Sequence, residues 1–151
     1  MADTVYFDDV VERLRVTSAR RTITDADIMN FAGVSGDYNP LHTDDIFIRE
    51  ETSFRGRIAH GLLGLAVGSG LKSELDSWLV LAYLTASRDF VGPIYPGDTI
   101  WVEYAVTEKR ASRSKPDRGV VTLAVELKNQ DGEVVQRGTD VLLLGRREDA
   151  A

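Results

Sequence analysis

A carboxylate and an imidazole lie five residues apart in a short segment that glycine and proline bend. Residues 35–42 read Ser-Gly-Asp-Tyr-Asn-Pro-Leu-His, which puts Asp37 and His42 on an irregular backbone. Such a backbone can turn both side chains toward one point. An acid–base pair can remove a proton from water as it attacks one carbon and deliver a proton to the neighbouring carbon. The pair therefore predicts reversible hydration chemistry.

The same segment also has a purely structural interpretation. Asp37 and Asn39 are residue types that form Asx-turn hydrogen bonds, and His42 would then be a partly buried ring with a backbone partner. For the second histidine of the chain, His60, we expect a structural role at the entrance of a helix. We expect no metal site, because two histidines among scattered acids match no recognised zinc spacing.

The elements that must position these residues begin with a helix that precedes the segment. Thr24 is a capping residue type, and Asp27 three residues later completes a capping-box pair. Acidic residues in the first turn also suit the positive end of the helix dipole. Gly33 and Gly36 indicate where the helix ends and a turn begins.

Two further helices are expected before the main strands. The first is short and runs from Thr43, as its cap, to about Glu51. The second runs from His60 to about Leu75, with apolar residues on all sides and glycines among them. A helix that is apolar almost all round is a buried helix, and tight packing against a sheet would compensate for its glycines.

Residues 14–22 have weak strand character, and four stronger strand patterns follow the helices. They lie at residues 80–90, 99–109, 119–129 and 134–144. Apolar and less apolar residues alternate in the third run, as expected for a sheet with one covered face. Asp131 and Gly132 indicate a hairpin between the third and fourth runs. We expect an α+β fold in which the four runs form an antiparallel meander.

The composition is that of an ordinary globular protein. The 151 residues are 43% hydrophobic and 28% charged, which suits one domain with one core. The absence of cysteine excludes disulfides, thiolate nucleophiles and thiolate metal sites. A net charge of −6 argues against a nucleic-acid partner. The basic residues at 109–118 are expected to form a solvated hairpin loop.

No segment of the sequence has the character of a membrane span or a signal peptide. The longest apolar stretches, such as residues 61–71, are far shorter than the ~20 residues that cross a bilayer. The N-terminal Met-Ala-Asp-Thr has no basic stretch followed by an apolar run. We therefore expect no membrane partner and a cytoplasmic location.

At residues 35–42 the chain resembles a known family. Together with Arg-Ile-Ala-His-Gly-Leu-Leu at 57–63, this segment is similar to the signature of R-specific enoyl-CoA hydratases and MaoC-like dehydratases. The segment at 90–98, which ends in Pro-Gly-Asp before a strand, also matches the family layout. The resemblance covers about residues 5–145. It implies one hot-dog domain over residues 1–151, an antiparallel sheet wrapped around a buried central helix.

The resemblance also implies roles for particular residues. Asp37 and His42 would hold and activate a water molecule, and Asn39 would fix the geometry of the catalytic loop. The backbone N–H of Gly61 would polarise the thioester carbonyl. That role has physical sense, because N–H groups in the first turn of a helix are free, although close packing explains a glycine equally well. No cofactor is implied.

The function predicted from these observations is that of a hydro-lyase in fatty acid metabolism. It would hydrate a 2-enoyl thioester of CoA or an acyl carrier to the (R)-3-hydroxyacyl thioester. Two alternatives remain: a thioesterase in which Asp37 activates water at the carbonyl, and a non-catalytic acyl-thioester-binding subunit. His42 disfavours the thioesterase, because carbonyl hydrolysis leaves the second proton-transfer group unexplained.

The sequence also predicts what this protein binds. Either Arg55 and Arg57 or the basic residues at 109–118 would meet the phosphates of CoA or phosphopantetheine, since guanidinium groups match phosphate geometry. The resemblance also implies that two domains pair through sheet edges, and such pairing would satisfy the free backbone groups of an edge strand. We therefore expect a homodimer or a higher homo-oligomer.

Overall fold

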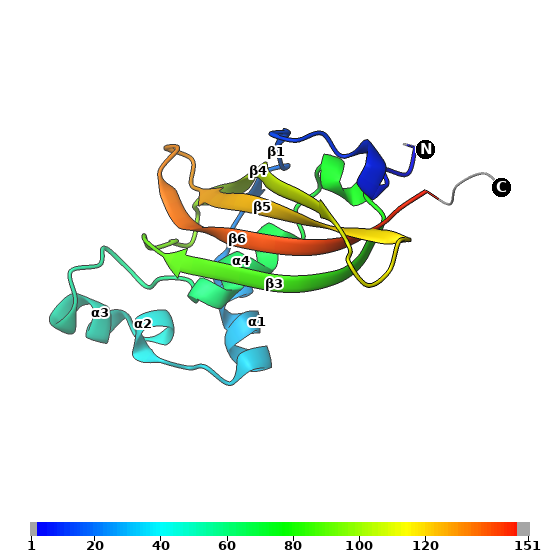
Figure 1. Cartoon of the computed structure of the whole chain (residues 1–151). Helices are drawn as coiled ribbons and strands as arrows, with labels where there is room; N and C mark the ends of the chain where they lie inside the picture. The colour runs from blue at the N-terminus through cyan, green and yellow to red at the C-terminus, as the bar shows by residue number, and fades with distance from the viewer. Residues whose placement is uncertain (1–2, 148–151) are drawn as a thin grey trace.

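Six strands form one antiparallel sheet in the computed structural model, which describes residues 3–147 (Figure 1). The strand order is β1-β4-β5-β6-β3, and β2 pairs with β4 beside this path. The strands are β1 (Arg15–Thr17), β2 (Arg21–Thr22), β3 (Val80–Phe90), β4 (Thr99–Ala111), β5 (Arg118–Lys128) and β6 (Val134–Gly145). All four long strands start within one residue of their expected positions. The predicted α+β class is confirmed.

One face of the sheet forms the core. On β5, Val121, Leu123, Val125 and Leu127 are buried and alternate with partly exposed residues, as the sequence pattern predicted. The β5–β6 hairpin is also confirmed, and Gly132 adopts a φ of 77° in its turn. Glycine reaches this left-handed region at little steric cost, which explains its place in the turn.

The expected meander is wrong at its first strand, because β3 pairs with β6 and not with β4. Residues 91–98 join β3 to β4 and contain Pro93 and Pro96, so they cannot form a tight hairpin. This connection instead crosses the end of the sheet, where Val91 N–H donates to Val135 O and Gly97 N–H donates to Ile23 O. As a result β3 is left at the edge of the sheet.

Helix α1 (Asp25–Ser35) begins as the sequence predicted. The Thr24 hydroxyl accepts from the Asp27 N–H at 3.2 Å, and the Asp27 carboxylate accepts from the Thr24 N–H at 2.8 Å. This backbone hydrogen bond lowers the pKa of Asp27. The helix ends at Gly36, whose φ of 75° is the left-handed cap conformation.

The next helical segment differs from the expectation. It consists of two short helices, α2 (Pro40–Thr43) and α3 (Asp45–Glu51), and Asp44 rather than Thr43 caps the second. The Asp44 carboxylate accepts from two backbone N–H groups of α3, whereas the Thr43 hydroxyl donates to the carbonyls of Tyr38 and Asn39. Both residue types can cap a helix, and Pro40 at the first position of α2 favours a separate helix that starts there and includes Thr43.

Helix α4 (Gly61–Ser69) lies against the sheet, but it is shorter and less buried than expected. It ends at Ser69 rather than near Leu75, and Leu62 is 60% exposed. The predicted close packing of its glycines is present. A Cβ atom at Gly64 would lie 2.4 Å from Gln136 Nε2, and one at Gly68 would lie 3.2 Å from Leu127. Glycine therefore lets this helix approach the sheet closely.

The remaining helical turns are the 3-10 segments Phe7–Asp9 and Glu74–Ser77. Within residues 3–147, the helices lack the combination of length and hydropathy that a membrane crossing requires. Helices α2 and α3 lie beyond one end of the sheet and α1 lies below the sheet near α4, whereas the 3-10 segment Phe7–Asp9 lies toward the other end (Figure 1). The segment that carries Asp37 and His42 is therefore at the α2–α3 end.

Candidate active site

The loop that carries Asp37 is held by local hydrogen bonds. Asn39 N–H donates to Asp37 Oδ1 at 3.1 Å, and Leu41 N–H donates to Asn39 Oδ1 at 3.0 Å, which makes Asn39 the cap of α2. These are the Asx-turn bonds of the structural interpretation. Because the turn uses Oδ1 of Asp37, the second carboxylate oxygen is left for another partner.

The ring of His42 is held from a distant part of the sequence. Its Nδ1 lies 2.7 Å from the carbonyl oxygen of Ile58, and the side chain is 10% exposed. A carbonyl oxygen only accepts, so Nδ1 carries a proton, and in the neutral imidazole Nε2 is then the acceptor. The histidine is thus anchored by one ring nitrogen and offers the other.

The two unused atoms face each other. Asp37 Oδ2 and His42 Nε2 are 3.9 Å apart, which is too long for a hydrogen bond. The Asp37 side chain is 52% exposed, so this gap opens to solvent. Two acceptors at this separation suit one water molecule that donates a hydrogen bond to each. The structure therefore brings together the acid–base pair that the sequence predicted.

His60 is part of the same group of side chains. Its ring stacks on that of His42, with centroids 3.7 Å apart and planes 27° apart. Its Nε2 lies 2.9 Å from the backbone carbonyl of Asp37, to which it donates. His60 lies at the entrance of α4, as expected from the sequence, whereas its contacts with His42 and Asp37 were not predicted because they depend on how α4 meets the loop.

Proximity alone would allow a metal ion at Asp37, His42 and His60, whose candidate ligand atoms lie within 4.8 Å of one another. The ring geometry argues otherwise. A metal lies near the plane of each imidazole that binds it, and two stacked rings do not direct their lone pairs to one point. The Nε2 of His60 is also occupied by the Asp37 carbonyl. Hydrogen bonding rather than metal coordination explains this cluster better.

Gly61 is the first residue of α4, where backbone N–H groups have no partner within the helix. A Cβ atom at this position would lie 2.7 Å from Cδ1 of Phe90, so close packing by itself requires glycine. The Gly61 carbonyl accepts from Gln136 Nε2 at 2.8 Å. Both interpretations of Gly61 are therefore compatible with its surroundings.

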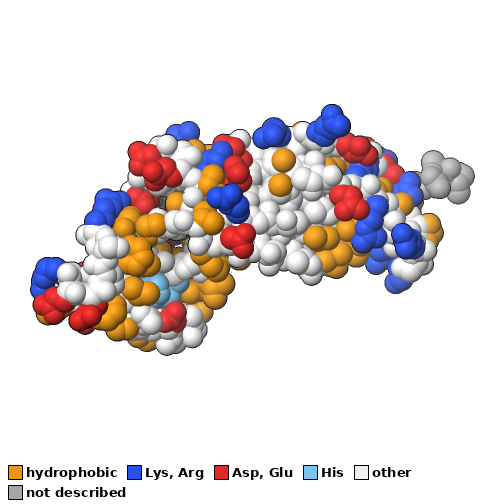
Figure 2. All heavy atoms as spheres, turned by 60° about the vertical axis from the view of Figure 1, so that its left-hand side comes forward, with side chains coloured by type: hydrophobic (Ala, Val, Ile, Leu, Met, Phe, Trp, Pro, Cys, Tyr) orange, Lys and Arg blue, Asp and Glu red, His pale blue; other side chains and the backbone are white. Residues whose placement is uncertain are grey.

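A cavity of about 310 Å³ adjoins Gly61. Its wall includes Phe54, Ile58, Phe90, Ile94 and Gln136. Among the described residues that line it, Gln136 alone has a polar side chain, so the cavity suits an apolar group. Figure 2 shows the histidine surface surrounded by hydrophobic side chains next to a hollow. Neither Phe90 nor Gln136 was predicted to line the site, and both reach it from the sheet.

The two candidate phosphate-binding arginines have different surroundings. Arg57 is mostly buried and pairs with Asp45 at 2.7 Å and with Asp25 at 3.0 Å. The hydrogen bond that Arg57 donates to Asp45 raises the pKa of Arg57, so the charge of this arginine is engaged in joining α1 and α3. Arg55 is 69% exposed, and its guanidinium lies 4.0 Å from the ring centroid of Tyr95. Arg55 is the freer of the two, although it also approaches Asp98 at 3.4 Å.

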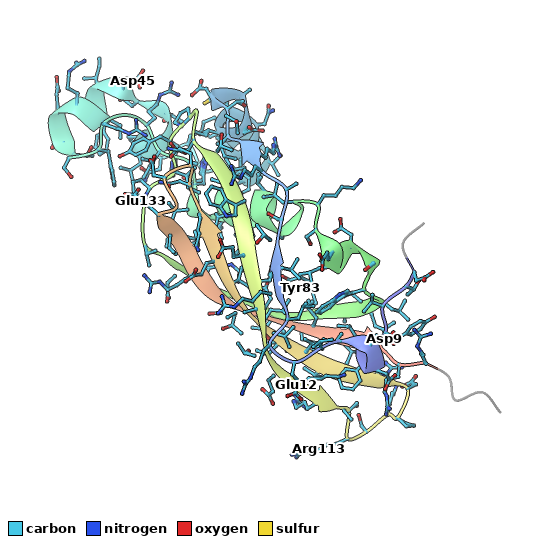
Figure 3. The ribbon with its side chains drawn as sticks, turned by 90° about the horizontal axis from the view of Figure 1, so that it is seen from above. Asp9, Glu12, Asp45, Tyr83, Arg113 and Glu133 are labelled. Atoms are coloured by element: carbon cyan, nitrogen blue, oxygen red, sulfur yellow. The ribbon has the colours of Figure 1, made fainter. Side chains whose placement is uncertain are left out.

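The third basic candidate, residues 109–118, is remote from this site. It spans the turn between β4 and β5, and Lys109 donates to the carbonyls of Asp8 and Val10. In Figure 3, Arg113 lies at the opposite end of the molecule from Asp45 of α3. These positions support the solvated hairpin rather than a phosphate site.

Comparison with known families gives a match over most of the chain. A family model described as a MaoC like domain matches residues 7–129. The chain is 33% identical over 119 residues to the (R)-specific enoyl-CoA hydratase of Aeromonas caviae, which covers 79% of this chain and 84% of that protein. It is also 33% identical over 111 residues to Protein MaoC of Klebsiella aerogenes, covering 73% of this chain and 33% of that longer protein.

Solved structures share the architecture. The MaoC-like dehydratase from Rhodospirillum rubrum superposes with a TM-score of 0.80 at 32% identity, covering 96% of this chain and 99% of that chain. A Mycobacterium tuberculosis protein described as a double hotdog fold gives a TM-score of 0.82 at 21% identity, over 98% of this chain and 46% of that chain. The second likeness concerns the fold alone, and the predicted hot-dog fold is confirmed.

Proposed function

Because the chain belongs to the MaoC-like domain family, we propose that it is a hydro-lyase that adds water reversibly to a 2-enoyl thioester. The product would be the (R)-3-hydroxyacyl thioester, in line with the name of the Aeromonas relative. The observation that carries the proposal is the gap of 3.9 Å between Asp37 Oδ2 and His42 Nε2. Each side chain is anchored by its other polar atom, so the pair is preorganised around a water-sized space.

In the proposed reaction, Asp37 and His42 bind one water molecule and take a proton from it as its oxygen bonds to C3 of the substrate. The π electrons of the C2–C3 bond move toward the thioester carbonyl, and C2 then takes up a proton. Both atoms start as acceptors, so the proton removed from water can be returned to C2 through the pair. The sum is the addition of one water.

Negative charge develops on the thioester oxygen during this step and needs a hydrogen-bond donor. We assign that role to the backbone N–H of Gly61, because a helix N-terminus carries free N–H groups and positive potential. The bond from Gln136 to the Gly61 carbonyl holds this first turn against β6. Gln136 would therefore help to fix the direction of the donor.

The apolar cavity next to Gly61 would receive the acyl chain. Its volume of about 310 Å³ is at the small end of ligand pockets, which favours a short acyl group. Arg55 lines a second hollow that shares Val91, Gly92 and Pro93 with the cavity wall. We propose that Arg55 meets a phosphate of CoA or an acyl carrier, since exposed guanidinium groups match phosphate oxygens.

We also propose that two copies of the chain pair along β3. This strand forms a long edge of the sheet, and its backbone is open to a partner on one side. Its large hydrophobic side chains are 40–54% exposed: Val80, Leu81, Tyr83, Leu84 and Phe90. Phe90 also lines the cavity, so a second copy would cover the mouth of the acyl site. Leu84→Lys should give a monomer in sedimentation velocity, and an unchanged dimer would contradict this edge.

The proposal is tested by incubating the purified protein with crotonyl-CoA. Loss of the conjugated enoyl-thioester absorbance, together with chiral analysis that finds the (R)-3-hydroxyacyl thioester, is the expected result. Release of free CoA without hydration would instead indicate the thioesterase. No reaction across short, long and branched enoyl thioesters on CoA and on an acyl carrier would reject the hydro-lyase and favour the acyl-binding subunit.

A further inference from the structure

His60 makes contacts that a helix-entrance residue does not need. It occupies the N-cap position of α4, yet its side chain makes no capping hydrogen bond. Instead its Nε2 donates to the backbone carbonyl of Asp37 at 2.9 Å, 23 residues earlier in the chain. The residue is 3% exposed, so water does not compete for this bond. The bond ties the Asp37 loop to the residue that precedes Gly61.

The second contact of His60 is with the other half of the acid–base pair. Its ring stacks on the ring of His42 with centroids 3.7 Å apart. It also meets Phe31 of α1 in a tilted contact, with centroids 5.0 Å apart. The His42 ring is therefore fixed in its plane by the Ile58 carbonyl and against its face by His60.

A polar ring at position 60 carries an energetic cost, and a need to fill space would not account for it. Because Nε2 donates, Nδ1 is an acceptor, and it is buried with no hydrogen-bond partner among the described residues. An unpartnered buried acceptor is unfavourable, and an apolar ring of similar size would avoid it. The imidazole is therefore explained by the Nε2 bond to the Asp37 loop rather than by filling space.

We infer that His60 is a positioning residue of the hydration site. It places Asp37 through the backbone, holds His42 through the ring, and shares a peptide bond with Gly61. All three groups of the proposed reaction would thus have one common support. This inference rests on the proposed function, and one arm of its test does not need a substrate.

Two substitutions separate the hydrogen bond from the ring. In His60→Gln the amide nitrogen is the same number of bonds from Cα as Nε2, so the donor is kept and the ring is lost. In His60→Phe the ring is kept and the donor is lost. Misplaced catalytic groups commonly cost up to about 100-fold in rate, so kcat of His60→Phe should fall by about 10- to 100-fold with little change in KM. His60→Gln should recover most of that loss.

Phe31→Leu is the matched control, because it loosens the packing of His60 and leaves the Asp37 bond intact. This variant should lower the melting temperature through altered packing, while kcat stays close to the wild-type value. Should His60→Phe and His60→Gln lose only melting temperature in the same way, with unchanged kcat, the positioning role is refuted and His60 is structural.

Nuclear magnetic resonance tests the stack and the loop without turnover. The chain has two histidines, so each His60 variant retains His42 as its single imidazole and needs no assignment. The His42 ring resonances should shift in His60→Gln, because the stacked ring and its ring current are lost. The Asp37 and Asn39 amides should shift in His60→Phe, which lacks the donor, and should stay near their wild-type positions in His60→Gln, which keeps it. Unmoved His42 and loop resonances would overturn the inference even if the protein proved to be a hydratase. Absent turnover in the wild type, with these shifts present, would reject only the function.

Discussion

Replacing Asp37 with Asn tests the proposed chemistry with little disturbance of the fold. The asparagine keeps an oxygen that accepts from the Asn39 N–H, so the Asx turn is preserved. Its second terminal atom becomes an amide nitrogen, which donates hydrogen bonds and cannot take a proton from water. The change therefore removes the base while the loop keeps its shape.

For Asp37→Asn, the structure predicts a small effect on folding stability and a large effect on rate. The Asp37 side chain is 52% exposed and is too far from His42 for a direct hydrogen bond, so the loss of its charge should change the free energy of unfolding by less than about 1 kcal/mol. A general acid–base group contributes about 10²–10⁴-fold to kcat, or roughly 2.7–5.4 kcal/mol of barrier. The loss of rate should therefore far exceed any loss of stability.

The companion variant, His42→Ala, should lose rate to a similar degree and also lose stability. It removes a buried ring and leaves the Ile58 carbonyl without its donor, which costs about 1–3 kcal/mol. Groups that act as a unit are not additive in their effects on rate. The double variant should consequently be little slower than the poorer single variant.

The assay is the initial rate of crotonyl-CoA hydration over a range of substrate concentrations, with thermal unfolding measured on the same preparations. The expected pattern is a large fall in kcat with a KM that changes little. Near-full turnover in a folded Asp37→Asn or His42→Ala protein would refute the mechanism. A raised KM with retained kcat would make the pair part of a binding site.

Three further predictions test the surrounding structure. Gly61→Ala keeps the N–H donor but brings Cβ to 2.7 Å from Phe90, so it should lower the free energy of unfolding by about 1–3 kcal/mol. If packing is the reason for glycine, adding Phe90→Leu to this variant should recover stability in thermal melts. Arg55→Glu should raise KM more at low salt than at high salt, whereas Arg113→Glu at the far end should not; equal effects would remove Arg55 from the binding site. Asp27→Asn should cost about 1 kcal/mol at neutral pH, because the lowered pKa of Asp27 stabilises the fold above the ordinary value of 3.8. That difference should vanish in melts as the pH falls below 3.8 toward the folded pKa, and a constant gap would contradict the assignment.

The sequence predicted those features whose physical causes are local. The capping box of α1 depends on Thr24 and Asp27, which are three residues apart, and both reciprocal hydrogen bonds form as expected. The β5–β6 hairpin depends on the turn chemistry around Gly132 and on the alternation of the flanking strands. In each case the residues that determine the structure are neighbours in the chain, so the pattern alone was sufficient.

Features that depend on partners far apart in the sequence were missed. The position of β3 next to β6 is determined by competition among strands for pairing partners, which alternation within β3 does not reveal. The length of α4 was overestimated because its apolar residues continue past Ser69 into a segment where Leu71 packs in the core without helical structure. Tertiary contacts override local preference in both cases.

The candidate site combines the two kinds of information. The Asx turn that positions Asp37 Oδ1 is local, and it was part of the structural interpretation that the sequence allowed. The carbonyl of Ile58 that anchors His42 Nδ1 is 16 residues away and belongs to a backbone whose path no side-chain pattern indicates. Each reactive group is thus held by one polar atom and acts through the other, and the width of the gap between them depends on both anchors. A sequence motif can therefore identify the acid and the base, whereas the 3.9 Å that suits a water molecule is a property of the fold.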